Sequence, residues 1–268
     1  RTFIMTTMPQ EANNYIFTGT CRAGSGVVAA VTSYLAERNC YICALEQFDD
    51  DSTNKFFMRA VFRPQQGSPS IENIRESFNQ VSDAFDMEWR IHDPKVAVKT
   101  LIMVSKYDHC LDDILYRRRK GEFNMEVTAV VSNHVDLRAM VEREGIRFIH
   151  LPVTKDTKTQ QEQRLLEIVA ETGTELVVLA RYMQILSNEL SAELSGRCIN
   201  IHHSFLPGFK GAKPYHQAYE RGVKVIGATA HYVTTDLDEG PIIEQILTRV
   251  NHNYKPEHLV RVGRDNES

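Results

Sequence analysis

The sequence predicts an α/β protein in two parts: a ferredoxin-like β-α-β-β-α-β unit, then a doubly wound and mostly parallel sheet. Strand and helix patterns alternate over the first 92 residues in the split ferredoxin-like order. From residue 99 onward, near-continuous apolar runs alternate with helical patterns that end at glycine. Such runs are typical of parallel strands that are buried on both faces. The chain of 268 residues is long enough for two modest domains.

In the first part, helices are read from apolar residues at helical spacing and strands from aromatic and β-branched runs. The first helix, for example, has Val27, Val31, Tyr34 and Leu35 on one face. The predicted strands cover residues 15–20, 41–48, 56–62 and 87–91, and the predicted helices cover residues 27–38 and 70–85. The two middle strands form a hairpin around a polar turn. We therefore expect a first domain over residues 1–92, a linker over 93–98 and a second domain over 99–268.

The second part repeats a strand and a helix several times. Its predicted strands cover residues 99–104, 127–131, 147–151, 176–179 and 198–202. Its predicted helices cover residues 111–120, 135–144, 159–171 and 187–194. Successive β-α units give a parallel sheet, and ligands of such sheets bind at the carboxyl ends of the strands.

Composition excludes several classes of function. The net charge of −4 and the pI near 6.2 give no global attraction to nucleic acid. No run approaches the ~18 apolar residues of a membrane span, and residues 1–14 lack a signal pattern. The five cysteines form an odd, scattered set, which favours reduced thiols. We expect a cytoplasmic protein with no nucleic-acid or membrane partner.

Asn200 and His202 end a predicted strand, and Asp238 lies in a polar loop farther along the chain. Residues two apart on a strand face the same side, so the amide and the imidazole can converge on one point. A carboxylate beside an imidazole can raise its pKa or take a proton from water. The alternative is that one side chain caps a loop and the other packs. The sequence also leaves open whether Asp236, Asp238 or Glu239 points inward.

Other motifs indicate no metal or nucleotide site. Cys40 and Cys43 form a lone C-x-x-C without the second pair or the histidines that zinc requires. His202 and His203 are adjacent, so on a strand they point to opposite faces. Neither G-x-G-x-x-G nor G-x-x-x-x-G-K-[ST] occurs in the chain. We expect no bound metal.

The second part resembles the folate-dependent formyltransferases over residues 99 to about 260. The resemblance rests on the string N-I-H-H-S-F-L-P at residues 200–207, on the Asp238 loop, and on L-A-R-Y-M-Q-I-L at residues 179–186. Further strings at residues 47–50, 56–59, 105–111 and 227–233 resemble the formyltetrahydrofolate deformylases, the hydrolytic members of that superfamily. These strings span both parts of the chain.

This resemblance implies a formyltransferase-type catalytic domain behind an ACT domain that regulates it. It implies hydrolysis of 10-formyltetrahydrofolate to formate and tetrahydrofolate, which supplies formate for purine synthesis and balances one-carbon pools. Asn200, His202 and Asp238 match the catalytic trio of that family. The implied folate-binding residues are Leu179, Arg181, Tyr182, Met183, Gln184, Ile185, Leu186, His203, Thr234, Thr235 and Asp236. No covalently bound cofactor is implied; an amino acid is a candidate effector, and a homo-oligomer is expected.

One departure from the transferases favours water as the acceptor of the formyl group. In the glycinamide ribonucleotide transferases a glycine-rich loop after the first strand cradles a phosphate. Here that loop, residues 105–110, has no glycine and contains Asp108, which leaves backbone amides less free and repels phosphate. Two alternatives remain: a formyltransferase with an amine acceptor, and a folate or amino-acid binding sensor without turnover.

Overall fold

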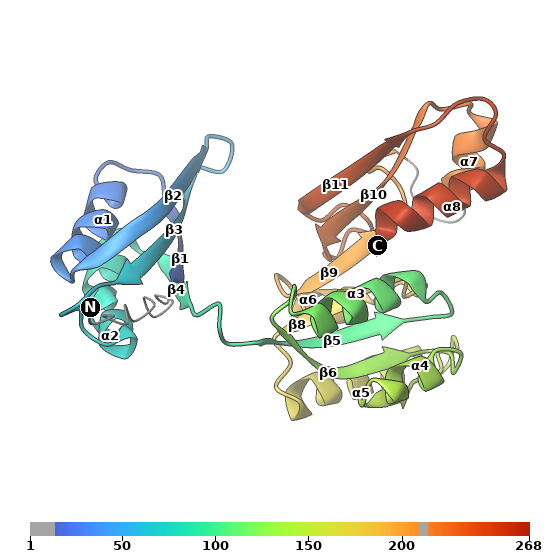
Figure 1. Ribbon diagram of the computed structural model, residues 1–268, viewed down its shortest axis with the longest axis horizontal. Helices are drawn as coiled ribbons and strands as arrows, with labels where there is room; N and C mark the ends of the chain where they lie inside the picture. Colours follow the sequence, from blue (N-terminus) through green and yellow to red (C-terminus); the bar gives the residue numbers. More distant parts are fainter. Residues whose placement is uncertain (1–13, 209–213) are drawn as a thin grey trace, which may run out of the picture. The chain divides into compact units, whose positions relative to one another are not determined.

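The computed structural model describes residues 14–208 and 214–268, and it divides into two compact units between Val96 and Ala97 (Figure 1). Two parts of the sequence predictions lie outside the described residues. One is the start of the first domain, including the stretch predicted to lack a signal pattern. The other is residues 209–213, part of the Gly- and Pro-containing sequence after His202.

The first unit has the predicted β-α-β-β-α-β order. Its elements are β1 (Tyr15–Arg22), α1 (Val27–Glu37), β2 (Cys40–Asp50), β3 (Lys55–Pro64), α2 (Ile71–Phe85) and β4 (Glu88–His92). The sheet order is β2-β3-β1-β4, and every pair is antiparallel. Alternate residues of β1 are buried, so one face of the sheet packs on the helices in a core that includes Phe17, Phe62 and Phe78. The Ser70 hydroxyl caps α2 by accepting from the Asn73 amide at 3.2 Å.

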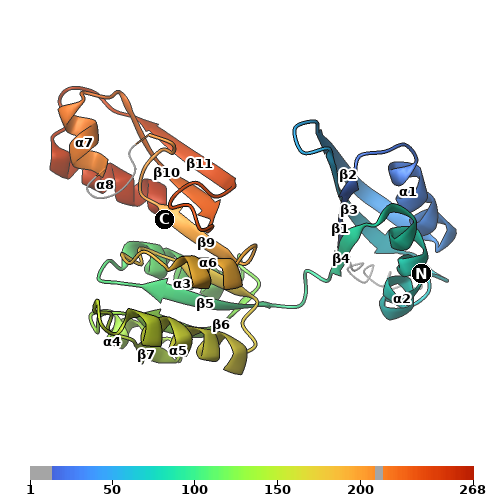
Figure 2. The same cartoon turned by 180° about the vertical axis from the view of Figure 1, so that it is seen from behind.

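The second unit is a seven-stranded sheet in the order β11-β10-β9-β8-β5-β6-β7 (Figure 2). Its strands are β5 (Val98–Val104), β6 (Met125–Ser132), β7 (Phe148–His150), β8 (Leu176–Leu179), β9 (Cys198–His202), β10 (Val225–Tyr232) and β11 (Ile242–Arg249). Its helices are α3 (His109–Lys120), α4 (Arg138–Arg143), α5 (Lys158–Glu171), α6 (Asn188–Glu193), α7 (Pro214–Glu220) and α8 (Pro256–Glu267). Strands β5 to β9 pair in parallel, whereas β10 pairs antiparallel with both β9 and β11. The prediction of a mostly parallel, doubly wound sheet is therefore confirmed.

Strand β5 shows why the run from Leu101 to Val104 is apolar. Leu101 and Met103 pack toward α5 and α6, while Ile102 and Val104 pack toward α3 and α4. From Thr100 to Val104 both faces of the strand are buried, whereas Lys99 near its start is exposed. This central strand fixes the carboxyl edge of the sheet.

Several features differ from the prediction. Helix α4 begins at Arg138 rather than at residue 135. Helices α7 and α8 were not predicted. In α8 the buried positions are Leu259, Gly263, Asn266 and Glu267, of which Leu259 alone is a large apolar residue. All five cysteines are free thiols, as expected. Among the helices of the described residues, none combines the length and apolarity needed to cross a membrane, and the cytoplasmic location stays a prediction.

Candidate active site

Strand β9 brings Asn200 and His202 to the carboxyl edge of the sheet. In the antiparallel pairing with β10, Asn200 lies opposite His231 and His202 lies opposite Thr229. Asn200 and His202 are two residues apart, and both line the same pocket. The predicted convergence of amide and imidazole is therefore present, and β10 adds a second imidazole beside them.

The loop after β10 places Asp238 against these groups. Gly240 packs so closely that a Cβ there would lie 1.8 Å from the Tyr232 carbonyl oxygen, and the Tyr232 amide donates to the Pro241 carbonyl at 2.9 Å. Asp238 has a φ of 58°, a backbone region that aspartate tolerates better than most residues. The tight turn thus directs one carboxylate inward, with only 7% of its side chain exposed.

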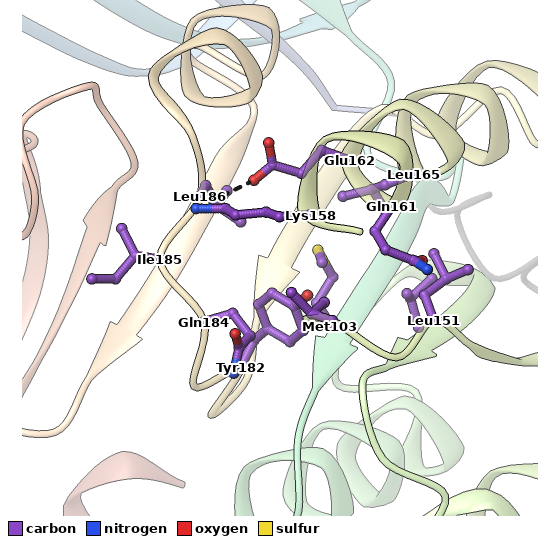
Figure 3. A pocket seen from close by; sticks show the side chains of 12 residues that line it. Met103, Leu151, Lys158, Gln161, Glu162, Leu165, Tyr182, Gln184, Ile185 and Leu186 are labelled. Carbon is purple, nitrogen blue, oxygen red and sulfur yellow. Dashed lines mark ion pairs between the residues drawn. The ribbon is translucent and has the colours of Figure 1, made fainter. Parts of the chain in front are cut away.

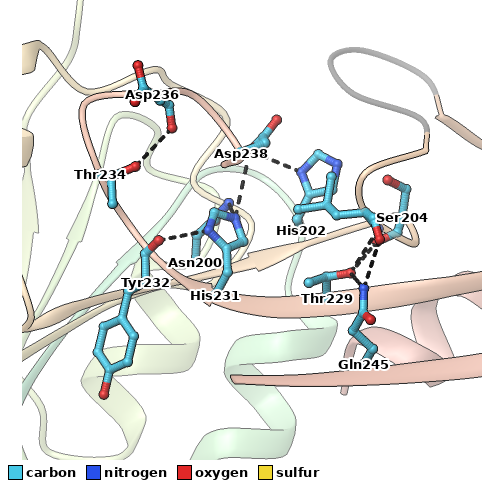
Figure 4. Close-up of polar contacts among 11 residues, drawn as sticks. Asn200, His202, Ser204, Thr229, His231, Tyr232, Thr234, Asp236, Asp238 and Gln245 are labelled. Carbon is cyan, nitrogen blue, oxygen red and sulfur yellow. Dashed lines mark hydrogen bonds and ion pairs between the residues drawn. The ribbon is translucent and has the colours of Figure 1, made fainter. Parts of the chain in front are cut away.

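Asp238 faces both imidazoles (Figure 4). Its Oδ1 lies 3.3 Å from His202 Nδ1 and 3.8 Å from His231 Nε2. Burial by itself raises the pKa of Asp238, but the hydrogen bond from His202 and the charges of the histidines outweigh it and lower the pKa below its usual value. An ionised Asp238 accepts a hydrogen bond from the Nδ1–H group of His202. Nε2 is then the nitrogen of that ring that can exchange a proton with a substrate. Asp236 and Glu239 are exposed, so Asp238 is the one of the three acidic residues whose carboxylate points inward.

His231 is a site residue that the predicted set did not include. Its Nδ1 lies 2.9 Å from the Tyr232 carbonyl oxygen, and its Nε2 lies 3.2 Å from Asn200 Nδ2. A carbonyl only accepts, so Nδ1 carries the proton and a neutral Nε2 accepts from the amide. His231 therefore fixes the orientation of Asn200. Only the register between β9 and β10 reveals this role, because the two residues are 31 positions apart.

A polar network anchors the turn that follows β9 (Figure 4). The Thr229 hydroxyl donates to the Ser204 carbonyl at 2.9 Å and accepts from the Leu206 amide at 3.1 Å. Gln245 of β11 donates to the Leu206 carbonyl at 3.0 Å and to the Thr229 hydroxyl at 3.1 Å. The antiparallel extension of the sheet thereby holds the backbone that leaves His202.

A pocket of about 440 Å³ opens beside these groups. All residues of the predicted site line it: Leu179, Arg181, Tyr182, Met183, Gln184, Ile185, Leu186, Asn200, His202, His203, Thr234, Thr235, Asp236 and Asp238. The lining also includes residues outside the predicted set: Asn188, Ser191, Ile201, His231, Val233 and Leu237. The pocket is large enough for a drug-sized ligand.

The segment 179–186 forms one wall of this pocket and is held from two sides. The Met183 amide donates to the Ser105 hydroxyl at 3.0 Å, and that hydroxyl donates to Asn133 Oδ1 at 2.6 Å. The Ser187 amide donates to Glu162 of α5 at 2.9 Å. A small second pocket lies near this segment (Figure 3). Its lining includes Tyr182, whose hydroxyl pKa burial raises to about 12, so this wall carries no phenolate at neutral pH.

His203 faces a different electrostatic environment from Asp238. Burial lowers its pKa, and the nearby charges of Arg181 and His202 lower it further, to about 4. His203 is therefore neutral at pH 7, and the pocket contains an uncharged imidazole next to His202.

One cluster has the spacing of metal ligands within the described part of the chain: His109, Cys110 and Glu267. Glu267 already accepts from His109 Nε2 at 2.8 Å, and the guanidinium of Arg181 lies 3.4 Å from it. Burial and the Glu267 charge raise the pKa of Cys110 to about 12, so this thiol is protonated. The Glu267 carboxylate is thus already held by a cation and by neutral donors, which fits an internal anion better than a metal ligand. The expectation of no metal stays a prediction.

Comparisons with known proteins agree with this geometry. The sequence model of the formyl transferase family matches residues 98–268. The formyltetrahydrofolate deformylase of Corynebacterium sp. (strain P-1) is 51% identical over 257 residues, which cover 96% of this chain and 90% of that protein. The crystal structure of the formyltetrahydrofolate deformylase from Burkholderia mallei ATCC 23344 has a TM-score of 0.90 and 52% identity, covering 95% of this chain and 90% of that one. Glycinamide ribonucleotide transformylase 1 from Symbiobacterium toebii has a TM-score of 0.60 and 31% identity, covering 64% of this chain and 82% of its own.

Proposed function

Because this chain belongs to the formyltetrahydrofolate deformylases, within the formyl transferase family, we propose that it hydrolyses 10-formyltetrahydrofolate to formate and tetrahydrofolate. The observation that carries the proposal is the convergence of Asn200, His202 and Asp238 at one edge of a ligand-sized pocket. An amide, an imidazole and a carboxylate are the groups that polarise a carbonyl and activate water.

The geometry supports the following roles. Asn200, oriented by His231, donates a hydrogen bond to the formyl oxygen. His202 in its protonated form stabilises the tetrahedral oxyanion and passes a proton toward N10, the leaving nitrogen. Asp238 holds the His202 ring through Nδ1 and stabilises the imidazolium, or it accepts the proton of the attacking water. Removal of one oxyanion donor typically lowers the rate by roughly 100- to 1000-fold.

The folate is proposed to lie along the segment 179–186, with His203, Thr234, Thr235 and Asp236 completing its contacts. Apolar side chains such as Met183 and Ile185 are exposed in the pocket wall, which suits the flat faces of a pteridine ring. The rigid attachment of this wall to Ser105 and Glu162 supports binding without a large rearrangement.

The loop between β5 and α3 favours water over an amine as the acceptor. It contains no glycine and carries Asp108, and the Ser105 hydroxyl at its start accepts from the Met183 amide and donates to Asn133. Without glycine the loop backbone turns less freely around a phosphate, and the Asp108 carboxylate repels one. A formyltransferase with an amine acceptor is the second candidate, because the fold of the second unit is shared with a transferase.

One incubation distinguishes the candidates. The protein is mixed with 10-formyltetrahydrofolate alone, and formate is measured over time. Release without any acceptor is the expected result. Release that requires an added amine would indicate transfer instead, and binding without turnover would indicate a folate sensor.

The first unit is proposed to be an ACT-type regulatory domain that binds an amino-acid effector and pairs with a second copy. Its β-α-β-β-α-β order supports this, as does the exposure of Tyr41, Leu45 and Phe48 on the edge strand β2. The proposed role in the cell is to supply formate for purine synthesis and balance one-carbon pools. Light scattering tests the homo-oligomer, and formate release with added amino acids tests the effector.

A further inference from the structure

Arg181 has a backbone conformation that a glycine would adopt at lower cost. Its φ is 62°, in the left-handed region that glycine adopts readily and that a residue with a Cβ adopts only at a cost. The residue follows β8 in the pocket wall, and only 10% of its side chain is exposed. A strained backbone that carries a long, buried side chain indicates that the side chain itself has a function.

The guanidinium of Arg181 is held in one place. Its Nη1 lies 3.4 Å from Glu267 Oε2, and its Cζ lies 4.9 Å from the centre of the Tyr107 ring. Nε and Nη1 are buried and make no hydrogen bond within the part of the chain that the structure describes. The side chain thus occupies space beside the pocket without the saturated hydrogen bonding of a purely structural arginine.

Glu267 is the anchor of this arrangement. Its side chain is 1% exposed and accepts hydrogen bonds from His109 Nε2 at 2.8 Å and from the Tyr215 hydroxyl at 2.7 Å. Burial alone raises the pKa of Glu267, but the His109 bond, the Arg181 charge and the Tyr215 bond outweigh it and lower the pKa. Glu267 is therefore ionised at neutral pH and pairs with Arg181 as a fixed anion.

The Arg181–Glu267 pair lies on the His203 side of the catalytic groups. The His203 ring is 5.2 Å from that of His202 and 6.2 Å from that of Tyr215, and the Arg181 charge lowers the His203 pKa. The pair therefore belongs to the immediate surroundings of the site where the formyl carbon is attacked.

We propose that Arg181, held by Glu267, determines acceptor specificity by filling the space through which an amine would approach the formyl carbon. The inference rests on the proposed hydrolysis and names the residue that selects water. In hydrolysis a water oxygen bonds to the formyl carbon, the bond from that carbon to N10 breaks, one water proton goes to N10, and formate keeps the oxygen and releases the other proton to solvent. With an amine, a bond from the amine nitrogen to the formyl carbon forms instead, the bond to N10 again breaks, and one amine proton goes to N10. The same trio serves both reactions, so the choice depends on which nucleophile fits.

The test is the ratio of products in Arg181→Gly, a change that opens the space and also relieves the backbone strain. The full chain is incubated with 10-formyltetrahydrofolate and increasing concentrations of glycinamide or hydroxylamine. Formate and the N-formyl amine are measured in the same sample. Wild type is expected to give formate, whereas Arg181→Gly raises the ratio of N-formyl amine to formate at least about tenfold, the range for one pocket group.

Two further variants complete the design. Arg181→Lys keeps most of the volume and the charge, so its ratio should match that of wild type. Glu267→Gln leaves Arg181 without its anion and should raise the ratio of N-formyl amine to formate, but by less than Arg181→Gly does. If Arg181→Gly is inactive, Glu267→Gln is the variant that tests the inference. An unchanged ratio in an active Arg181→Gly, or in Glu267→Gln when it is the deciding variant, overturns the inference. Failure of wild type to release formate without an amine overturns the proposed function instead.

Discussion

Replacement of Asp238 by asparagine should slow formate release by roughly a thousandfold. The carboxylate lies 3.3 Å from His202 Nδ1, and a charge pair at that distance is worth about 5 kcal/mol at an effective dielectric constant of about 20. The amide oxygen can still accept the Nδ1 proton, which retains about 1 kcal/mol. The remaining loss of about 4 kcal/mol from the imidazolium-like transition state corresponds to about three decades in rate.

The assay is formate release from 10-formyltetrahydrofolate at several substrate concentrations. Because Asp238 acts on the imidazolium rather than on the folate, kcat should fall while KM changes little. Glu239→Gln is the matched control, since it removes a neighbouring carboxylate that is exposed and does not line the pocket. Near-normal kcat in Asp238→Asn, or an equal loss in the control, would refute the assigned role.

Three other outcomes are expected. Gly263→Ala should lower the free energy of unfolding by about 1–3 kcal/mol, seen as a lower Tm, because a Cβ there would lie 2.1 Å from Tyr215 Cζ; an unchanged Tm would contradict the packing. Stability in urea should fall as pH drops from about 6.5 toward 4, since the folded state keeps His203 neutral while the unfolded chain binds a proton there. It should fall further as pH drops through and below the ordinary carboxyl pKa values of 3.8 and 4.5, because Asp238 and Glu267 have lowered pKa values in the folded state; His203→Asn should remove the first decrease only. Exhaustive chelation should leave formate release unchanged, because the metal-like cluster around Glu267 already holds a buried guanidinium, and a loss restored by added metal would show otherwise.

Much of the fold was predictable because the sheet signals are local. The apolar run of β5 reads directly as a strand buried on both faces, and the structure confirms it through Leu101 and Ile102, which pack into different cores. Helix α8 gave a weaker signal, since beside the apolar Leu259 it buries Asn266 and Glu267 through specific polar contacts. A pattern of polar residues does not show which of them will be buried.

The site shows the same division between local and long-range information. Asn200 and His202 are two apart on one strand, so their convergence follows from strand geometry alone. The choice of Asp238 over its acidic neighbours depends on the tight packing of Gly240 against Tyr232, which the spacing of charges does not show. The role of His231 depends on the register between β9 and β10. The sequence therefore identifies the chemical groups, whereas the structure shows which of them face each other.

The two halves of the site come from different elements, so their effects should be separable in one protein. The trio comes from β9 and the loop after β10, and the Arg181–Glu267 pair comes from the segment after β8 and from α8. Asp238→Asn should slow attack by water and by an amine to a similar extent, because both pass through the same oxyanion. The double variant Asp238→Asn with Arg181→Gly should then have the low rate of the first and the product ratio of the second. Single-turnover measurement of both products, with glycinamide present, tests this. A product ratio that returns to the wild-type value would mean that the two halves are coupled and that Arg181 acts through His202 rather than by filling space.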